Sequence, residues 1–340
     1  MEVVATAPVR VADAGGWTDT WFARHGQVCN LAVTPGATVR AALRPAADGT
    51  IELAVVAFGE RYAYPAAEPP GRHPLLEAAI ARHAPVGSLT VSVEAGVPPG
   101  SGVGTSAAVT VALIGALLVL GGRDAGPDAV ARAAHQVETV DLRQQSGVQD
   151  QLAAAHGGAL LITITAFAEA TVFPDATVAH LPLSPTTWDA LGRRLLTVSL
   201  GQPHRSSEVH TEVIAGLVRD PSRRDRLEPL RRAAADAAAA LVAGDLDAYG
   251  AALRANTTAQ AGLHPALVSP AAHRLFDLAG RHRAVGWKVN GAGGDGGSVT
   301  LVTGDDAAGA ADLRRALTGA GWPILALSPG AAGLGVAQVD

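Results

Sequence analysis

The chain has 340 residues, of which 48% are hydrophobic and 17% are charged, so it can bury a sizeable core in two domains or in one large domain. The formal net charge is −5 and no cluster of Lys and Arg stands out, which argues against nucleic acid and anionic membranes as partners. The only cysteine, Cys29, rules out an internal disulfide, and because the N-terminus lacks a basic stretch followed by an apolar one, we expect a cytoplasmic protein.

In chain order, the first half alternates apolar strands with helices. The expected strands are Val3–Ala12, Cys29–Thr34, Thr38–Leu43, Ile51–Phe58, Leu89–Glu94 and Ala159–Thr165. Helical spacing of apolar residues predicts helices at Ser106–Gly121 and from Pro127 to about Arg143. The longest apolar run, Ala107–Leu120, is shorter than the roughly 18–20 residues that a membrane crossing needs. It is therefore predicted to be a core helix.

A stretch flanked by prolines, Phe173–Thr187, marks the expected boundary between two domains, residues 1–175 and 176–340. The second half is predicted to contain strands at Leu195–Leu200, Ser298–Thr303 and Pro323–Ser328, and helices at Glu208–Val218, Leu230–Leu241, Leu246–Asn256, Ala271–Arg281 and Asp306–Ala320. The alanine-rich tract 231–246 has strong helix formers, which predicts a surface helix. This mixture of helices and strands indicates an α+β fold.

The stretch VPPGSGVGTSAAV, residues 97–109, places three glycines on alternate positions directly before the first predicted helix. Such a loop lets the backbone approach a ligand closely, and the helix that follows presents unpaired N–H groups, which suits a phosphate. The spacing fits neither a Walker A loop nor a dinucleotide-binding fingerprint. A tight turn with Thr105 or Ser106 as the helix N-cap is the alternative interpretation.

Lys288 is the only lysine among 26 basic residues, and five glycines follow it between Gly291 and Gly297. Because arginine serves at every other cationic position, this position is predicted to need a compact ammonium group. Chance retention is the alternative.

Three motifs in order resemble those of the GHMP kinases, the superfamily of galactokinase, homoserine kinase, mevalonate kinase and phosphomevalonate kinase. They are APVRVADAGGWTDT (Ala7–Thr20), PPGSGVGTSAA (Pro98–Ala108) and KVNGAGGDGG (Lys288–Gly297). The stretches GGWTDT and SGVQDQLAAAHGG (Ser146–Gly158) are most similar to the branch that holds D-glycero-D-manno-heptose 7-phosphate kinase and L-fucokinase. The resemblance spans nearly the whole chain.

The resemblance implies an N-terminal domain like domain 2 of ribosomal protein S5 and a ferredoxin-like C-terminal domain, with ATP and substrate between them. The second motif would wrap the nucleotide phosphates. Its expected cofactor-binding residues are Pro99, Gly100, Ser101, Gly102, Val103, Gly104, Thr105 and Ser106. The family's magnesium ligands match Ser106 and Glu138, and Mg²⁺ usually takes only one or two oxygen ligands from protein. A solvated helix carboxylate is the alternative for Glu138, and for His135, three residues before it, we expect a structural role.

By the same resemblance, Asp150 would act as base or orient the acceptor hydroxyl, and Arg10 would lie near the γ-phosphate and this carboxylate. A helix N-cap is the alternative for Asp150, and a surface strand arginine is the alternative for Arg10. The residues expected at the acceptor are Gly16, Trp17, Thr18, Asp19, Gln149, Asp150, Arg205, Lys288, Gly293 and Gly294.

These motifs predict an ATP- and Mg²⁺-dependent kinase of a sugar or sugar phosphate, and only the resemblance to this branch points to the anomeric hydroxyl. A kinase of a cyclitol or another polyol, and a non-catalytic regulator with the same fold, are the alternatives. We expect a monomer or homodimer with a small-molecule substrate, without nucleic acid or membrane partners.

Overall fold

The computed structural model describes residues 1–44, 48–168, 171–201 and 207–339. Within these residues the strands form two sheets, one of nine strands and one of four. The nine-stranded sheet has the order β13-β1-β2-β5-β3-β4, with β12 and β6 also on β2 and with β7 on β6. Its strands are β1 (Glu2–Ala14), β2 (Gly26–Leu43), β3 (Thr50–Val55), β4 (Glu60–Pro65), β5 (Leu89–Ala95), β6 (Ala159–Ala166), β7 (Asp175–His180), β12 (Ser328–Pro329) and β13 (Gly335–Val339).

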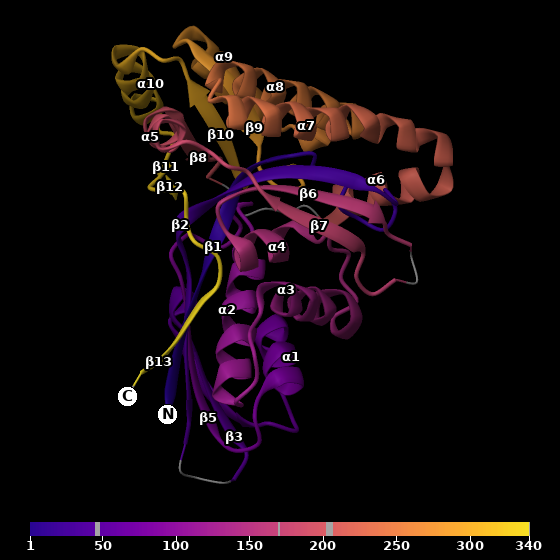
Figure 1. Cartoon of the computed structure of the whole chain (residues 1–340), viewed down its shortest axis with the longest axis vertical. Helices are drawn as coiled ribbons and strands as arrows, with labels where there is room; N and C mark the ends of the chain where they lie inside the picture. The colour runs from indigo at the N-terminus through magenta and orange to yellow at the C-terminus, as the bar shows by residue number, and fades with distance from the viewer. Residues whose placement is uncertain (45–47, 169–170, 202–206, 340) are drawn as a thin grey trace.

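The four-stranded sheet has the order β11-β8-β10-β9, and all of its pairs are antiparallel. Its strands are β8 (Leu195–Ser199), β9 (Ala284–Val289), β10 (Ser298–Thr303) and β11 (Ile324–Leu325). Strand β13 then returns to pair with β1, so the two ends of the chain lie near each other (Figure 1).

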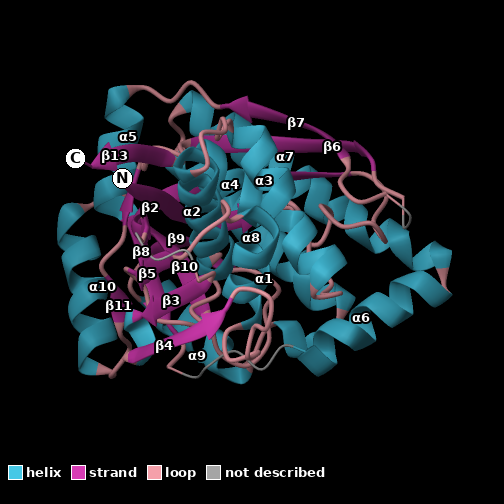
Figure 2. Cartoon of the chain, turned by 90° about the horizontal axis from the view of Figure 1, so that it is seen from below, coloured by secondary structure: helices cyan, strands magenta, loops and turns pink. Residues whose placement is uncertain are grey.

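Helices cover the sheets on more than one side (Figure 2). The helices are α1 (Pro74–His83), α2 (Thr105–Leu120), α3 (Pro127–Gln136), α4 (Gln149–His156), α5 (Pro185–Arg194), α6 (Ser207–Arg219), α7 (Glu228–Ala243), α8 (Leu246–Leu263), α9 (Pro270–Arg281) and α10 (Ala307–Gly319). A π-helical turn, Val137–Asp141, follows α3 directly. Helices α2 and α4 pack against β1 and β2 on one side, while α7 lies on the other side of these strands (Figure 1).

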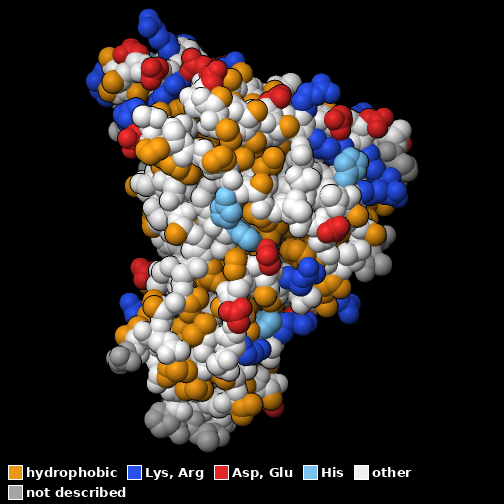
Figure 3. All heavy atoms as spheres, viewed as in Figure 1, with side chains coloured by type: hydrophobic (Ala, Val, Ile, Leu, Met, Phe, Trp, Pro, Cys, Tyr) orange, Lys and Arg blue, Asp and Glu red, His pale blue; other side chains and the backbone are white. Residues whose placement is uncertain are grey.

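Helix α2 owes its position to its composition, because nearly every residue from Ala107 to Leu120 is apolar and most of them are fully buried. A helix that is apolar on all sides belongs in the interior of a domain. The N-terminal end of α2, with the glycine loop before it, is thereby fixed at the edge of the core. Within the described residues, no helix is long and apolar enough to span a membrane. Acidic and basic side chains are interspersed on the face drawn in Figure 3.

Two expectations about elements need correction, and a third is confirmed. The predicted strands Cys29–Thr34 and Thr38–Leu43 are parts of one strand, β2, whose first half pairs with β6 and whose second half pairs with β5. The predicted boundary Phe173–Thr187 contains β7, which extends the nine-stranded sheet. The alanine-rich helix α7 is the amphipathic surface helix that was predicted, with one face of alanines packed into the large core and the other face exposed.

Candidate functional site

The glycine loop between β5 and α2 adopts backbone conformations that favour glycine. Gly100, Gly102 and Gly104 have φ angles of +77°, +71° and +75°, a region that residues with a Cβ atom rarely adopt. A Cβ atom on Gly102 would lie 3.3 Å from the carbonyl oxygen of Asn290. Gly104 is the N-cap of α2 and no side chain caps this helix, so Thr105 and Ser106 are not the N-cap residues.

Arg10 of the first motif and Ser298, which directly follows the third motif, hold the glycine loop in place. The Ser298 hydroxyl donates to the carbonyl of Ser101 at 2.6 Å, and the backbone N–H of Arg10 donates to the carbonyl of Val103 at 2.9 Å. The guanidinium of Arg10 donates to the carbonyl of Gly102 at 2.5 Å. Because these bonds use carbonyl groups, the amide N–H groups at the N-terminal end of α2 stay available for an anion.

The loop forms one wall of a cavity of about 500 Å³, which we call the loop pocket. Pro99, the three loop glycines, Thr105 and Ser106 line one side of it. The opposite side is mostly apolar and includes Val55, Phe58, Leu76 and Val93, with Arg72 and His73 at the same pocket. One polar side with free N–H donors and one apolar side suit a ligand that combines phosphates with a flat base.

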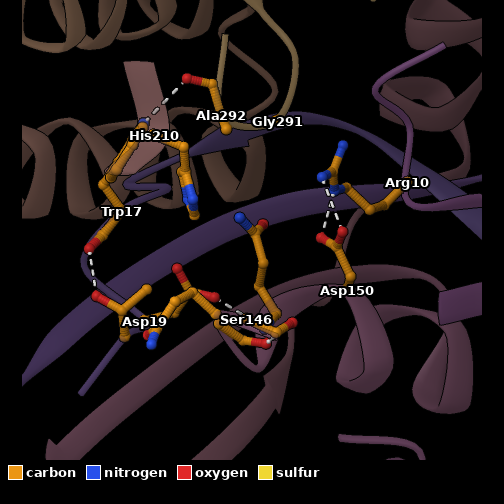
Figure 4. A pocket seen from close by; sticks show the side chains of 12 residues that line it. Arg10, Trp17, Asp19, Ser146, Asp150, His210, Gly291 and Ala292 are labelled. Carbon is orange, nitrogen blue, oxygen red and sulfur yellow. Dashed lines mark hydrogen bonds and ion pairs between the residues drawn. The ribbon is translucent and has the colours of Figure 1, made fainter. Parts of the chain in front are cut away.

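A smaller cavity of about 160 Å³, the polar pocket, lies next to it. Its lining comprises Arg10, Trp17, Asp19, Thr20, Gln145, Ser146, Gly147, Gln149, Asp150, His210, Gly291 and Ala292. Figure 4 shows Arg10 and Asp150 at one side of this cavity, with Trp17, Asp19 and His210 away from them. Four residues line both pockets, namely Arg10, Asp150, Gly291 and Ala292.

Arg10 and Asp150 form a bidentate ion pair in this shared wall. Nε of Arg10 donates to Oδ1 of Asp150 at 2.8 Å, and a terminal nitrogen of the guanidinium donates to Oδ2 at 3.1 Å. Burial alone would lower the pKa of Arg10, but the charges of Asp150 and Asp13 outweigh burial and raise this pKa above its usual range. The Arg10 guanidinium is therefore a permanent cation between the two pockets. This position excludes the alternative interpretation of Arg10 as a surface arginine on a strand.

Asp19 reaches the polar pocket from the turn after β1. The backbone N–H of Gln149, the first residue of α4, donates to its Oδ2 at 3.0 Å. The side chain is buried, and this burial, together with the charges of Asp150 and Asp13, raises the pKa of Asp19 to about 6. Near neutral pH it is thus a carboxylate that is only weakly stabilised in its charged form and can accept hydrogen bonds from a ligand.

Glu138 lies in the π-helical turn after α3. Gln151 donates to its Oε2 at 2.9 Å, whereas Oε1 is buried and has no hydrogen-bond partner among the described residues. Burial raises the pKa of Glu138 to about 7. The hydroxyl oxygen of Thr105 is likewise buried without a partner, and Ser106 is exposed at the loop pocket. These unpartnered hard oxygen atoms are compatible with Mg²⁺, which needs few protein ligands.

The two predicted catalytic residues are thus brought together, and so are most of the predicted loop residues. Of the loop residues, Ser101 and Val103 do not line the loop pocket, because Ser101 is buried against neighbouring carbonyls and Val103 is part of the core. Asp150 lies inside the first turn of α4 and not at its N-cap. His135 is buried against Phe167 and Phe173, as a structural histidine should be.

Several predicted acceptor residues do not line the polar pocket. Thr18 is buried and its hydroxyl bonds to the carbonyls of Gly15 and Gln27. Gly16 lies behind Asp13 and Gln149. The other three are Lys288, Gly293 and Gly294: Lys288 is fully buried beneath Asp13, and the two glycines pack against the backbone near Leu267. Arg205 lies outside the described residues.

Sequence reasoning missed other residues of the site. His210 lines the polar pocket with its ring 4.8 Å from that of Trp17, and Gln145, Ser146 and Gly147 approach from the loop before α4. Asp13 is fully buried between Arg10 and the third motif. The sequence alone could not reveal their distant neighbours, which are Trp17 for His210 and Lys288 and Gly291 for Asp13.

Comparisons with known proteins agree with this geometry. Residues 73–158 match the family described as GHMP kinases N terminal domain, so this part of the chain is a GHMP kinase N-terminal domain. The chain is 28% identical over 333 residues to the bifunctional fucokinase/GDP-fucose pyrophosphorylase of Arabidopsis thaliana, a match over 91% of this chain and 30% of that protein. A mevalonate kinase of Methanothermobacter thermautotrophicus is 41% identical over 103 residues, which are 29% of this chain and 33% of that protein. The matches therefore span about a third of the length of these relatives.

Solved structures show the fold over the whole chain. A D-glycero-D-manno-heptose 1-phosphate kinase from Bacteroides thetaiotaomicron superposes with a TM-score of 0.75 at 19% identity, covering 99% of each chain. The galactokinase of Lactococcus lactis, solved with galactose, superposes with a TM-score of 0.71 at 17% identity, covering 99% of this chain and 95% of that one. The predicted α+β GHMP kinase fold is confirmed.

Proposed function

We propose that this chain, whose residues 73–158 form a GHMP kinase N-terminal domain, is an ATP- and Mg²⁺-dependent kinase that phosphorylates a hydroxyl of a sugar or sugar phosphate. One observation carries the proposal: the Arg10–Asp150 pair stands in the wall shared by a loop pocket suited to phosphates and a polar pocket suited to hydroxyls. A phosphoryl group that passes from one pocket to the other must pass this pair. Relatives named fucokinase and neighbours named heptose kinase and galactokinase support a sugar as acceptor.

In the loop pocket, the nucleotide phosphates would bind at the N-terminal end of α2 and at the glycine loop. The apolar wall around Phe58 and Val93 would take the base. Binding at N–H groups that are fixed in place costs little reorganisation, so the loop stabilises the phosphates without moving.

Ser106 and Glu138 would hold the magnesium ion. When bound, Mg²⁺ would offset the negative charge of the nucleotide phosphates. The unpartnered Oε1 of Glu138 and hydroxyl of Thr105 support this assignment. A cation beside Glu138 also favours its carboxylate form.

At the polar pocket, Asp150 would orient the acceptor hydroxyl and receive its proton as the oxygen attacks the γ-phosphorus atom. The bond from this phosphorus to the bridging oxygen then breaks, and ADP leaves with the electron pair. Arg10 keeps Asp150 charged and stabilises the negative charge on the transferred group. Asp19 and Gln149 can bind neighbouring hydroxyls, and Trp17 offers a flat apolar face. The anomeric hydroxyl and a monomeric or dimeric state are further parts of this proposal.

The test is ADP release with Mg·ATP across free hexoses, fucose, heptose and hexose phosphates, cyclitols and homoserine, with mass detection of the product. We expect release that depends on one or two sugars and is lost in Asp150→Asn. Release only with a cyclitol would support the polyol alternative. ATP binding without release for any acceptor would favour a non-catalytic regulator, and absence of ATP binding would contradict the assignment of the glycine loop.

A further inference from the structure

An irregularity in β1 places Arg10 and Asp13 on the same side of the strand. The pairing of β1 with β2 shifts register between Val11 and Ala14, and Ala12 has a φ angle of +55°. In a regular strand, residues three apart point to opposite faces, because side chains alternate. Here a guanidinium nitrogen of Arg10 lies 4.0 Å from Oδ1 of Asp13. A bulge next to a site commonly redirects a side chain, and in this chain it directs Asp13 toward Arg10.

Asp13 is fully buried and surrounded by donors. The backbone N–H of Gly291 lies 3.1 Å from each of its carboxylate oxygens, and the side-chain amide of Gln149 donates to Oδ2 at 3.5 Å. The ammonium group of Lys288 lies 3.6 Å from Oδ1. Gly291 and Gln149 line the polar pocket. Asp13 lies behind this pocket and contacts the first motif through Arg10, the third motif through Gly291 and Lys288, and the start of α4 through Gln149.

Lys288 is also fully buried and has fixed partners. Its ammonium group donates to Oε1 of Gln260 at 3.1 Å and to the carbonyl of Val289. Burial lowers the pKa of Lys288, and the charge of Asp13 opposes this shift. The three donors of a compact ammonium fit this small enclosed space, whereas a planar guanidinium would not. This explains why the chain has arginine at every other basic position and lysine here.

Arg10, Lys288, Asp13 and Asp150 together form a group of two positive and two negative charges. Without Lys288, the buried carboxylate of Asp13 would be uncompensated except by Arg10 and would compete with Asp150 for the guanidinium. With Lys288 in place, Asp13 supports Arg10 from one side while two guanidinium nitrogens remain directed at Asp150.

We propose that Asp13 and Lys288 are positioning residues for phosphoryl transfer, which hold the Arg10 guanidinium in the orientation that engages Asp150. This inference rests on the proposed kinase function. It replaces the expectation that Lys288 contacts the substrate, and it assigns to Asp13 a role that no motif indicated.

The experiment compares Asp13→Asn, Lys288→Met and the double variant with the wild-type chain. Each single variant leaves one buried charge uncompensated, so we expect both to melt at lower temperature. The double variant removes both charges and keeps both shapes, so it should recover much of the lost melting temperature. Its kcat should nevertheless stay at least about tenfold below the wild-type value, with the Kd for Mg·ATP within about threefold, because Arg10 has lost its support.

Arg194→Met is the matched control, because Arg194 is another buried cation, paired with Asp247, and lines neither the loop pocket nor the polar pocket. It should lose stability while kcat measured well below its melting temperature stays near wild type. A double variant that folds and turns over at the wild-type rate would overturn the inference and leave the kinase function intact. Wild-type protein that binds Mg·ATP but phosphorylates none of the acceptors would instead refute the proposed function, and the positioning role would fall with it.

Discussion

Arg10 on β1 and Asp150 on α4 are 140 positions apart in the chain and meet in a two-pronged ion pair, with contacts of 2.8 and 3.1 Å. A third donor of the same guanidinium binds the carbonyl of Gly102. One side chain therefore connects the glycine loop, the proposed base Asp150 and, through Asp13, the third motif. Such a bidentate contact fixes the orientation of both side chains in addition to pairing their charges. A substitution of Arg10 or Asp150 should therefore change the orientation of the other side chain.

Asp150→Asn should lower kcat by at least about a thousandfold while the Kd for Mg·ATP changes little, because an amide keeps the shape but cannot accept the proton. Single-turnover kinetics and nucleotide binding measured on the same preparation check this. Asp189→Asn, at an exposed position on α5, is the control and should behave as wild type. Undiminished turnover in Asp150→Asn would show that Asp150 is not the residue that activates the acceptor.

Asp19→Asn should stabilise the protein at pH 7.5 while weakening acceptor binding. Burial raises the pKa of Asp19 from 3.8 to about 6, so between these values the folded state holds a proton that the unfolded state has lost. The free energy of unfolding therefore falls as pH rises through this window, and ionised Asp19 costs about 3 kcal/mol at neutral pH.

An asparagine at position 19 does not ionise. The Asp19→Asn variant should therefore melt at a higher temperature than the wild-type chain above pH 6, and this difference should shrink toward pH 4. Thermal melts of both proteins from pH 4 to pH 8 measure it. Equal melting temperatures at every pH would mean that the carboxylate is not destabilised in the fold. A rise in the KM for the acceptor, without a rise in the Kd for Mg·ATP, is expected from its place in the polar pocket.

Glu138 should make magnesium binding depend on pH. Burial raises the pKa of Glu138 to about 7, and a protonated carboxyl is a poor metal ligand, so Mg²⁺-dependent ATP binding should weaken up to about tenfold for each pH unit below 7. Titrations of Mg²⁺ at pH 6, 7 and 8 test this. In Glu138→Gln the magnesium requirement should rise and this pH dependence should disappear, whereas Glu94→Gln, at an exposed position on β5, should change neither. If Glu138→Gln bound Mg·ATP as wild type does, the metal ligands would have to be sought elsewhere.

The parts of the site that follow from local sequence were predicted well. The glycine loop needs positive φ angles at alternate residues, which glycines reveal directly, and a uniformly apolar helix after it must be buried. Arg10 and Asp150 were found through motifs, although nothing in the local pattern shows that they touch. The elements that were missed are mostly short: β4, α1, β7, α5, β9 and β13.

The rest depended on tertiary structure. Alternation along β1 would direct Arg10 and Asp13 to opposite faces, and only the irregularity at Ala12 brings them together. Lys288 was expected at the substrate because it begins the third motif of the resemblance, but its own strand, β9, carries it into the interior. His210 reaches the polar pocket from α6, far along the chain from the motifs that form the rest of it.

Gly102→Ala should weaken Mg·ATP binding more than it weakens the fold. Its φ of +71° strains any other residue, and the added Cβ would lie close to Asn290 and force the loop to shift. Gly122→Ala is a matched control, since Gly122 has a φ of +69° with nothing near its Cβ position. Both variants should lose about 1 kcal/mol of stability. Only Gly102→Ala should raise the Kd for Mg·ATP, by about tenfold or more. An equal affinity for Mg·ATP in both variants would show that the glycine loop does not bind the nucleotide.

The charge of the polar pocket predicts preference for acceptors without a phosphate group. Two carboxylates, Asp19 and Asp150, line it, and Arg10 is the one Arg or Lys in its described lining. That guanidinium is already engaged by Asp150, and the N–H at the start of α4 is taken by Asp19, so a phosphate would face negative charge without a free cation. Matched pairs such as mannose and mannose 6-phosphate, or galactose and galactose 6-phosphate, should differ in kcat/KM by about 100-fold in favour of the free sugar, close to 3 kcal/mol. A higher kcat/KM for the phosphorylated sugar would contradict this prediction. If that preference for the phosphorylated sugar disappeared in Arg205→Ala, phosphate recognition would be assigned to the segment around Arg205.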